Sequence, residues 1–183
     1  MIFKIMSTIA KTLATNLKGC MSVDIEITNL TDAYCLTDPN GKCYRPPQPS
    51  VRPQKTEECS FCKTTISVMG TVGVLTYDLF KRQGGCTKEK VAIMFSVPYN
   101  YIKYENCLAI GIYADDKKCD EALYKEMYYD HEKSDSEKHG FVRKKAEDGG
   151  LNFKGSSLDI KATMSPVEQS VMKVEVWDKP RDD

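Results

Sequence analysis

Tyrosine is the residue type with binding chemistry that is concentrated in one segment of this sequence. The chain has ten tyrosines, and seven of them fall between positions 99 and 129: Tyr99, Tyr101, Tyr104, Tyr113, Tyr124, Tyr128 and Tyr129. A tyrosine ring is apolar and its hydroxyl is polar, which suits the boundary between water and a membrane. Its π-face also attracts a quaternary ammonium such as choline. Core packing explains any single tyrosine, but a cluster of seven favours a binding site.

Catalytic chemistry has little support in the sequence. The chain carries two histidines and none of the serine-hydrolase, zinc-protease, phosphate-loop or dinucleotide motifs. Its 26 basic and 26 acidic residues give no net charge, which argues against a nucleic-acid partner. We therefore expect no enzyme activity and no cofactor.

Eight cysteines are the other reactive groups, and Cys59 and Cys62 have the spacing of half a zinc site. No second pair at this spacing exists, so we expect no metal site. Lys4 and Lys11 interrupt the apolar residues of the N-terminus, which excludes a signal-peptide core. We therefore expect reduced thiols and a cytoplasmic or non-classically secreted protein that converts to a membrane-bound form.

Residues 1–19 predict an amphipathic helix that ends near Gly19. Lys4, Lys11 and Lys18 recur seven apart on one side, and no acidic residue precedes Asp24. The helix either docks on the core or lies in a bilayer interface, and it can do both in turn. The apolar residues recur at three- and four-residue steps: Ile2, Ile5, Met6, Ile9, Leu13 and Leu17.

Residues 20–178 read mainly as short strands, with one further helix and a polar tail at 179–183. Strands alternate polar and apolar residues or are rich in β-branched residues, and Gly84-Gly85 predicts a turn. Residues 37–56 and 130–150 read as loops. Strands are predicted at 22–28, 64–80, 91–97, 108–113, 158–164 and 171–177, and a helix at 115–129. The fold class is mainly β, a compact β-sandwich flanked by two α-helices within one domain, 1–183.

Three motifs in this order resemble the actinoporins, a family of pore-forming proteins. They are Gly70–Tyr77 (GTVGVLTY), Phe95–Tyr101 (FSVPYNY) and Ala122–Tyr129 (ALYKEMYY). Pro46–Pro53 and Met172–Lys179 are most similar to the actinoporin-like proteins of fish. The resemblance implies a sandwich that binds the phosphocholine headgroups of membrane phospholipids, sphingomyelin in particular. It also implies an N-terminal helix that inserts and forms a homo-oligomeric, cation-permeable pore.

The family's functional residues transfer to matching positions in this chain. For the headgroup pocket these are Val72, Ser96, Pro98, Tyr104, Tyr124, Tyr128 and Tyr129. For the membrane-docking loop they are Tyr99, Tyr101, Lys103, Cys107 and Leu108. Members of the family have tryptophans in this loop, whereas the only tryptophan here is Trp177. The alternative is therefore a non-lytic module that recognises lipid or carbohydrate, since the same fold in fungal lectins binds glycans.

Overall fold

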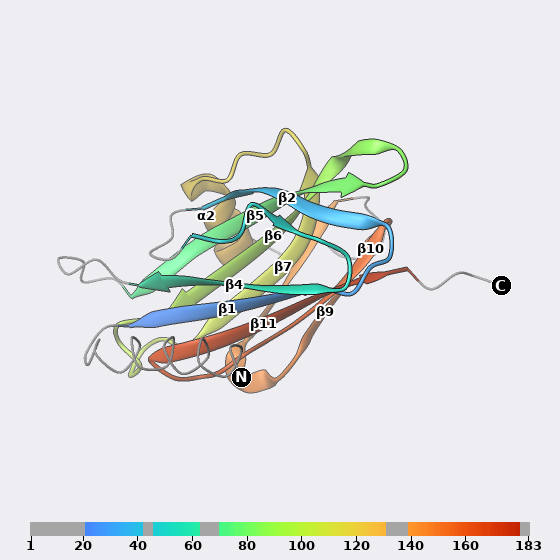
Figure 1. Ribbon diagram of the computed structural model, residues 1–183. Coiled ribbons are helices and arrows are strands. Elements are labelled where there is room, and N and C mark those ends of the chain that lie inside the picture. Colours follow the sequence, from blue (N-terminus) through green and yellow to red (C-terminus); the bar gives the residue numbers. More distant parts are fainter. Residues whose placement is uncertain (1–20, 42–45, 63–69, 131–138, 180–183) are drawn as a thin grey trace, which may run out of the picture.

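A computed structural model describes residues 21–41, 46–62, 70–130 and 139–179 of the chain (Figure 1). The predicted N-terminal helix, with Ile2, Ile5, Met6, Ile9, Leu13 and Leu17, lies outside the described residues, as does most of the predicted tail. Two β-sheets stack face to face in the described part of the chain (Figure 1). The predicted β-sandwich is confirmed.

One sheet has five strands in the order β4-β1-β11-β10-β9. β1 and β11 lie parallel and the other neighbouring strands are antiparallel. The strands are β1 (Ser22–Asn29), β4 (Lys55–Cys62), β9 (Leu151–Lys154), β10 (Leu158–Met164) and β11 (Gln169–Asp178).

The other sheet has six antiparallel strands in the order β3-β2-β5-β6-β7-β8. They are β2 (Tyr34–Asn40), β3 (Ser50–Val51), β5 (Thr71–Lys81), β6 (Gly85–Val97), β7 (Cys107–Ala114) and β8 (Gly140–Lys145). A short 3₁₀-helix, Ala146–Asp148, follows β8.

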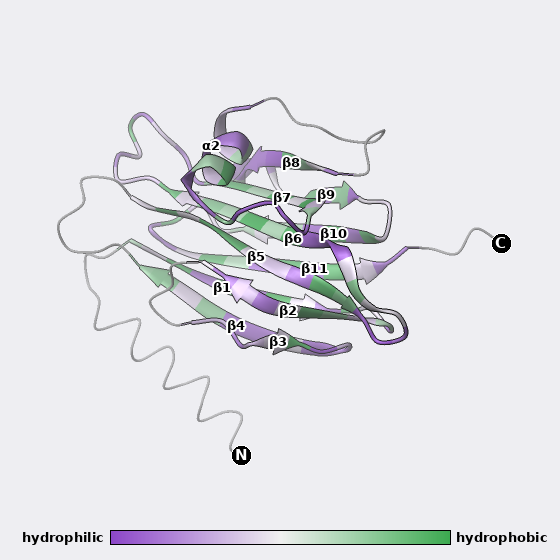
Figure 2. Ribbon diagram, turned by 90° about the horizontal axis from the view of Figure 1, so that it is seen from above, coloured by the Kyte–Doolittle hydropathy of each residue, from purple (hydrophilic) through white to green (hydrophobic). Residues whose placement is uncertain are grey.

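Side-chain alternation divides the interior into two cores. On β6, Val91, Ile93 and Phe95 point between the sheets, while Ala92 and Met94 point outward under a helix. Both faces of this strand are covered, so its last seven residues are all buried. On β1 and β11, by contrast, buried residues alternate with more exposed ones. Figure 2 shows hydrophilic and hydrophobic residues mixed along the strands of this sheet.

Helix α2 (Glu121–Tyr129) covers the outer face of the six-stranded sheet. Asp120 caps it, since its Oδ1 accepts hydrogen bonds from the backbone N–H groups of Ala122 (3.0 Å) and Leu123 (3.1 Å). The helix buries Leu123 and Met127 against β5, β6 and β8. None of the helices in the described part of the chain is long and apolar enough to cross a bilayer.

Several predicted boundaries were wrong. The helix predicted at 115–129 begins at Glu121, because Asp120 caps it. The loop predicted at 37–56 contains the end of β2, all of β3 and the start of β4, and the loop predicted at 130–150 contains β8. β4 and β8 are rich in charged residues because both are partly exposed, so they lack the apolar alternation of a typical strand.

Candidate functional site

Three neighbouring strands place a row of residues on the outer face of the six-stranded sheet. Val72 on β5 pairs with Ser96 on β6, and Ser96 pairs with Cys107 on β7. Val72 is 38% exposed, whereas Ser96 is buried. The row lies on the face that α2 covers, because Val74 and Met94 have the same parity on their strands and pack under the helix.

The last turns of α2 bring three tyrosines over this row. Tyr124 and Tyr128 are four residues apart, so their rings lie on one helix face and stack with centroids 5.6 Å apart. Tyr129 meets Tyr128 edge to face at 4.7 Å and is 70% exposed. The tyrosines form an aromatic cluster with one buried side, against the sheet, and one open side.

Hydrogen bonds with Ser96 connect the hydroxyl groups of the cluster to β6. Burial raises the pKa of Tyr124, and a hydrogen bond to Ser96 partly offsets that rise. Burial likewise raises the pKa of Tyr128, with Cys107, Tyr129 and Tyr104 near its ring and Ser96 again as a hydrogen-bond partner. Both hydroxyls therefore remain protonated at neutral pH and can donate hydrogen bonds.

The loop between β6 and β7 lies beside the cluster. Pro98 is buried at its start, and the following side chains are exposed, among them Tyr99 (61%), Tyr104 (55%) and Lys103. Asn100 shapes the tip, since its carbonyl oxygen accepts from the backbone N–H of Tyr104 at 3.0 Å and its Oδ1 from that of Ile102, also at 3.0 Å.

Asn106 fixes this loop to the turn between β10 and β11. Its Oδ1 accepts from the Tyr101 hydroxyl at 2.7 Å, and its Nδ2 donates to the carbonyls of Ser165 (2.9 Å) and Val167 (3.0 Å). Asn106 is only 1% exposed. A buried amide with these partners links a loop of the six-stranded sheet to a turn of the five-stranded sheet.

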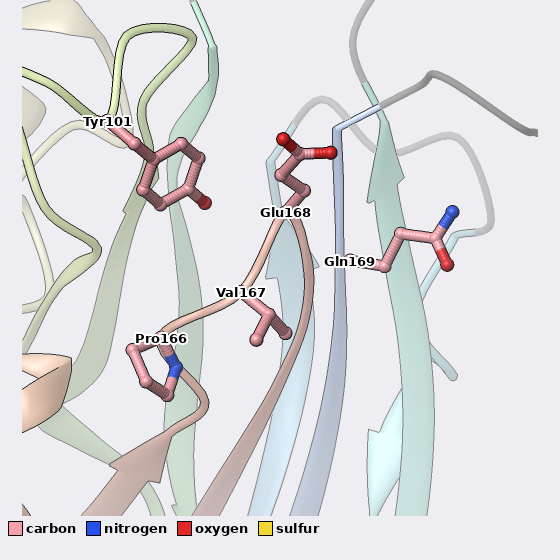
Figure 3. Close-up of a pocket in the computed structure, with 5 residues that line it drawn as sticks. All are labelled: Tyr101, Pro166, Val167, Glu168 and Gln169. Atoms are coloured by element: carbon pink, nitrogen blue, oxygen red, sulfur yellow. The ribbon is translucent and has the colours of Figure 1, made fainter.

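An open groove runs between the two linked segments. Figure 3 shows Tyr101 on one side and the Pro166–Glu168 segment on the other. The groove continues past Glu168 toward Met21, Tyr99 and Ile102. Burial raises the pKa of Tyr101, the hydrogen bond to Asn106 opposes this, and the nearby Glu168 carboxylate raises the pKa further.

Most residues of the predicted headgroup pocket lie around Tyr128. Tyr128 has Ser96, Tyr104, Tyr124 and Tyr129 as its neighbours. Val72 lies beside Ser96 in the sheet, and Pro98 follows β6 directly. Their role in lipid binding remains a prediction.

Leu108 was wrongly assigned to the docking loop. It lies on β7, is fully buried, and packs between the two sheets. Cys107 is also in the strand rather than the loop, on the opposite face from Leu108 and near Tyr128. Strand alternation separates the two side chains, so neither belongs to the exposed tip.

Ile102 is the residue that sequence reasoning missed. It is 96% exposed at the tip of the loop, more than any other large apolar side chain among the described residues. Its position between Tyr101 and Lys103 in the docking-loop segment was the available signal. Tyr99, Tyr101 and Lys103 remain predicted loop residues, and Ile102 joins them.

The half-zinc spacing has a structural explanation. Cys59 and Cys62 both lie on β4, three residues apart. Residues at odd separations on a strand point to opposite faces of the sheet, and Cys59 is buried while Cys62 is half-buried. The two sulfurs cannot share one zinc ion. Across the described ranges, no group of three or more His, Cys, Asp or Glu side chains is placed to hold a metal.

Comparison with known proteins identifies the family. A family model described as sea anemone cytotoxic protein matches residues 60–174, more than half of the chain. DELTA-alicitoxin-Pse1b of Phyllodiscus semoni is 46% identical over 59 residues, which are 32% of this chain and 24% of that protein. Deep-sea actinoporin Cjtox I of Cribrinopsis japonica is 40% identical over 67 residues, 37% of this chain and 28% of that protein. The matched part spans only about a quarter of these relatives.

The fold also has a solved counterpart. The crystal structure of the lipid binding protein Nakanori superposes with a TM-score of 0.66, covering 96% of this chain and 79% of that one. Sequence identity is only 6%, so this likeness shows the fold alone. The family description is that of a cytotoxic protein rather than an enzyme, as the sequence predicted. The family model, which matches more than half of the chain, shows that this chain belongs to the sea anemone cytotoxic protein family, the actinoporins.

Proposed function

We propose that the protein binds membranes by recognising the choline headgroups of phospholipids at the aromatic cluster. One observation carries the proposal: Tyr124 and Tyr128 stack over Ser96, with Tyr129 and Tyr104 exposed beside them. The rings can bind the trimethylammonium group of a phosphocholine headgroup through cation–π attraction. The protonated hydroxyls can donate hydrogen bonds to the phosphate of the same headgroup. Sphingomyelin is the finer proposal, supported by the family resemblance.

The exposed loop supports an approach to the bilayer from the same side. Tyr99 and Ile102 present apolar surface, and Lys103 adds a positive charge for lipid phosphates. Val167 lies across the groove and is 51% exposed. Exposed large apolar groups collect here, as at sites that contact membranes or other proteins.

We further propose that segment 2–17 inserts into the bilayer after docking and lines a cation-permeable, homo-oligomeric pore. The proposal rests on the apolar stripe of that segment and on the cytotoxic family to which the chain belongs. An acidic residue in the stripe costs about 2.5–3.5 kcal/mol at a bilayer centre. Ile9→Asp or Leu13→Asp should therefore abolish leakage while sparing binding. Thr12→Asp, on the polar side, is the matched control and should retain leakage.

The direct experiment measures co-sedimentation and dye leakage with the same vesicles. Phosphatidylcholine vesicles, with and without sphingomyelin, should bind the protein and leak. Phosphatidylglycerol vesicles provide headgroups without choline and should bind far less. Equal binding to both classes, or binding to phosphatidylglycerol alone, would contradict choline recognition. Leakage by Leu13→Asp at the unmodified rate would contradict the role of the N-terminal segment.

A non-lytic recognition module is the second candidate function. The loop tip presents Ile102 and Tyr99, whereas Trp177 lies on β11 in the other sheet. Tryptophan anchors proteins strongly in the membrane interface, so this loop tip should bind the interface less strongly than a tip rich in tryptophan. Binding without leakage would support a lipid-recognition module. Glycan binding that survives Tyr124→Ala and Tyr128→Ala, without lipid binding, would support a lectin.

A further inference from the structure

Among the described residues, the C-terminal end of α2 has neither a left-handed glycine cap nor a basic side chain in its last turn. The last carbonyl groups of a helix have no hydrogen-bond partners within the helix. A glycine in a left-handed conformation commonly ends the helix and lets the following backbone N–H groups bond to these carbonyls. Here the C-cap is Asp130, with an extended backbone, and the last turn has no basic residue of its own. Its N–H donates to the Glu126 carbonyl at 3.0 Å, which satisfies one of these groups.

Arg143 on strand β8 supplies further hydrogen-bond donors to the end of α2. Its Nη1 donates to the carbonyl oxygens of Met127 (3.2 Å), Tyr128 and Asp130 (3.2 Å). A guanidinium also places positive charge at the negative end of the helix dipole. Arg143 pairs with Ala109 on β7, whose small side chain leaves room beside it on the helix-facing side.

The carbonyls that Arg143 binds belong to the turn that presents the cluster. Tyr128 contributes both a ring stacked on Tyr124 and a carbonyl held by Arg143. Tyr129 lies between the bound carbonyls of Tyr128 and Asp130 and meets the Tyr128 ring edge to face. A shift of this turn would therefore move two of the three helix tyrosines relative to Ser96.

We propose that Arg143 is a positioning residue for the aromatic site: it holds the last turn of α2 so that Tyr128 and Tyr129 face the ligand. The inference rests on the proposed function for the identity of that ligand. The placement of the rings can be tested without any ligand. Arginine suits this role because its planar guanidinium donates in fixed directions and keeps its charge, whereas lysine is a flexible point donor.

Three variants separate positioning from general stability. Arg143→Met keeps the aliphatic stem and removes the donors, and Arg143→Lys keeps the charge. Lys117→Met is the matched control, because it breaks the Lys117–Glu126 ion pair, a different side-chain contact to the same helix. Each variant is measured by urea unfolding, by sedimentation with phosphatidylcholine–sphingomyelin vesicles, and by ¹⁹F NMR of 3-fluorotyrosine, with Tyr128 and Tyr129 assigned through their phenylalanine variants.

Arg143→Met should weaken vesicle binding by about tenfold, a loss on the scale of removing hydrogen bonds to a charged donor. It should also shift the Tyr128 and Tyr129 resonances. Arg143→Lys should restore part of both, and Lys117→Met should leave both unchanged even where it lowers stability.

Two outcomes would overturn the proposal. One is an Arg143→Met protein with unshifted Tyr128 and Tyr129 resonances. The other is a Lys117→Met protein that loses binding in proportion to its lost stability, just as Arg143→Met does. If the unmodified protein failed to bind vesicles, the proposed function would fail instead, and the resonances would still decide whether Arg143 positions the rings.

Discussion

The outer faces of the two sheets differ in what they carry. On the six-stranded sheet α2 covers apolar outward residues, with Val74, Ala92, Met94 and Ala109 buried beneath it. On the five-stranded sheet most outward residues are polar: Lys173 pairs with Glu26 at 3.6 Å, and Lys161 lies 4.7 Å above the Trp177 ring. The proposed site lies at the end of the covered face.

This difference explains where the proposed site lies. A helix packed on a sheet leaves a corner where its last turn ends, and side chains there have one buried and one open side. Tyr124 and Tyr128 occupy that corner, supported from below by Ser96. Trp177, on the flat open face, donates to Glu175 at 3.0 Å and lies under Lys161, so its ring already has partners.

The largest expected effect is a difference in unfolding free energy between matching substitutions on the two outer faces. Val74→Ala on β5 removes a buried side chain under α2, while Val171→Ala on β11 changes a residue that is 45% exposed. Val74→Ala should lower the free energy of unfolding by about 2 kcal/mol, and Val171→Ala by about 0.5 kcal/mol or less. Urea denaturation measures both. Equal losses would show that the two faces do not differ in this way.

A smaller effect is expected where the two sheets are linked beside the site. Asn106→Ala removes the amide that joins Tyr101 to the Ser165 and Val167 carbonyls. We expect a loss of about 1–2 kcal/mol in unfolding free energy. Vesicle binding should also weaken, because the loop that carries Ile102 loses its anchor. If Asn106→Ala lowered the urea midpoint but left vesicle sedimentation unchanged, the loop would not contribute to membrane binding.

The smallest effect is a pH dependence of stability to which the helix-covered tyrosines contribute. The pKa values of Tyr124 and Tyr128 are raised above the ordinary value of 10.0, mainly by burial. The unfolded state therefore loses these protons first, so their contribution to stability is complete below pH 10 and falls as pH rises above it. The urea midpoint should drop as the pH rises from about 10 to about 11. Tyr124→Phe should flatten that drop, whereas a slope unchanged by the substitution would contradict the assignment to Tyr124.

Sequence patterns predicted the strands that obey simple alternation. β1 and β10 have one core face each and appear at nearly their predicted positions, and β6 reads as a buried strand because both its faces are covered. β4 and β8 were missed because polar and charged side chains are tolerated on their exposed faces. Only the three-dimensional pairing of strands identifies them.

Prediction of the candidate site succeeded and failed for the same reason: motifs carry local information, whereas side-chain orientation depends on contacts between distant residues. The motifs located the tyrosines and Ser96, but a motif does not show which strand residue points outward. Leu108 was therefore assigned to the loop although it faces the core, and Ile102 was overlooked although it is almost fully exposed. Arg143 could not be assigned to the end of α2, because only tertiary structure brings β8 to that helix.

The most direct test of choline recognition compares one aromatic residue from each face. Tyr128→Ala and Trp177→Ala would be measured by sedimentation with phosphatidylcholine–sphingomyelin vesicles, after urea unfolding confirms that both fold. We expect Tyr128→Ala to weaken binding by about tenfold or more, since stacking and cation–π contacts are each worth about 0.5–2 kcal/mol. Trp177→Ala should bind like the unmodified protein. Loss of binding in Trp177→Ala, with binding retained in Tyr128→Ala, would place the lipid site on the other face and contradict the account.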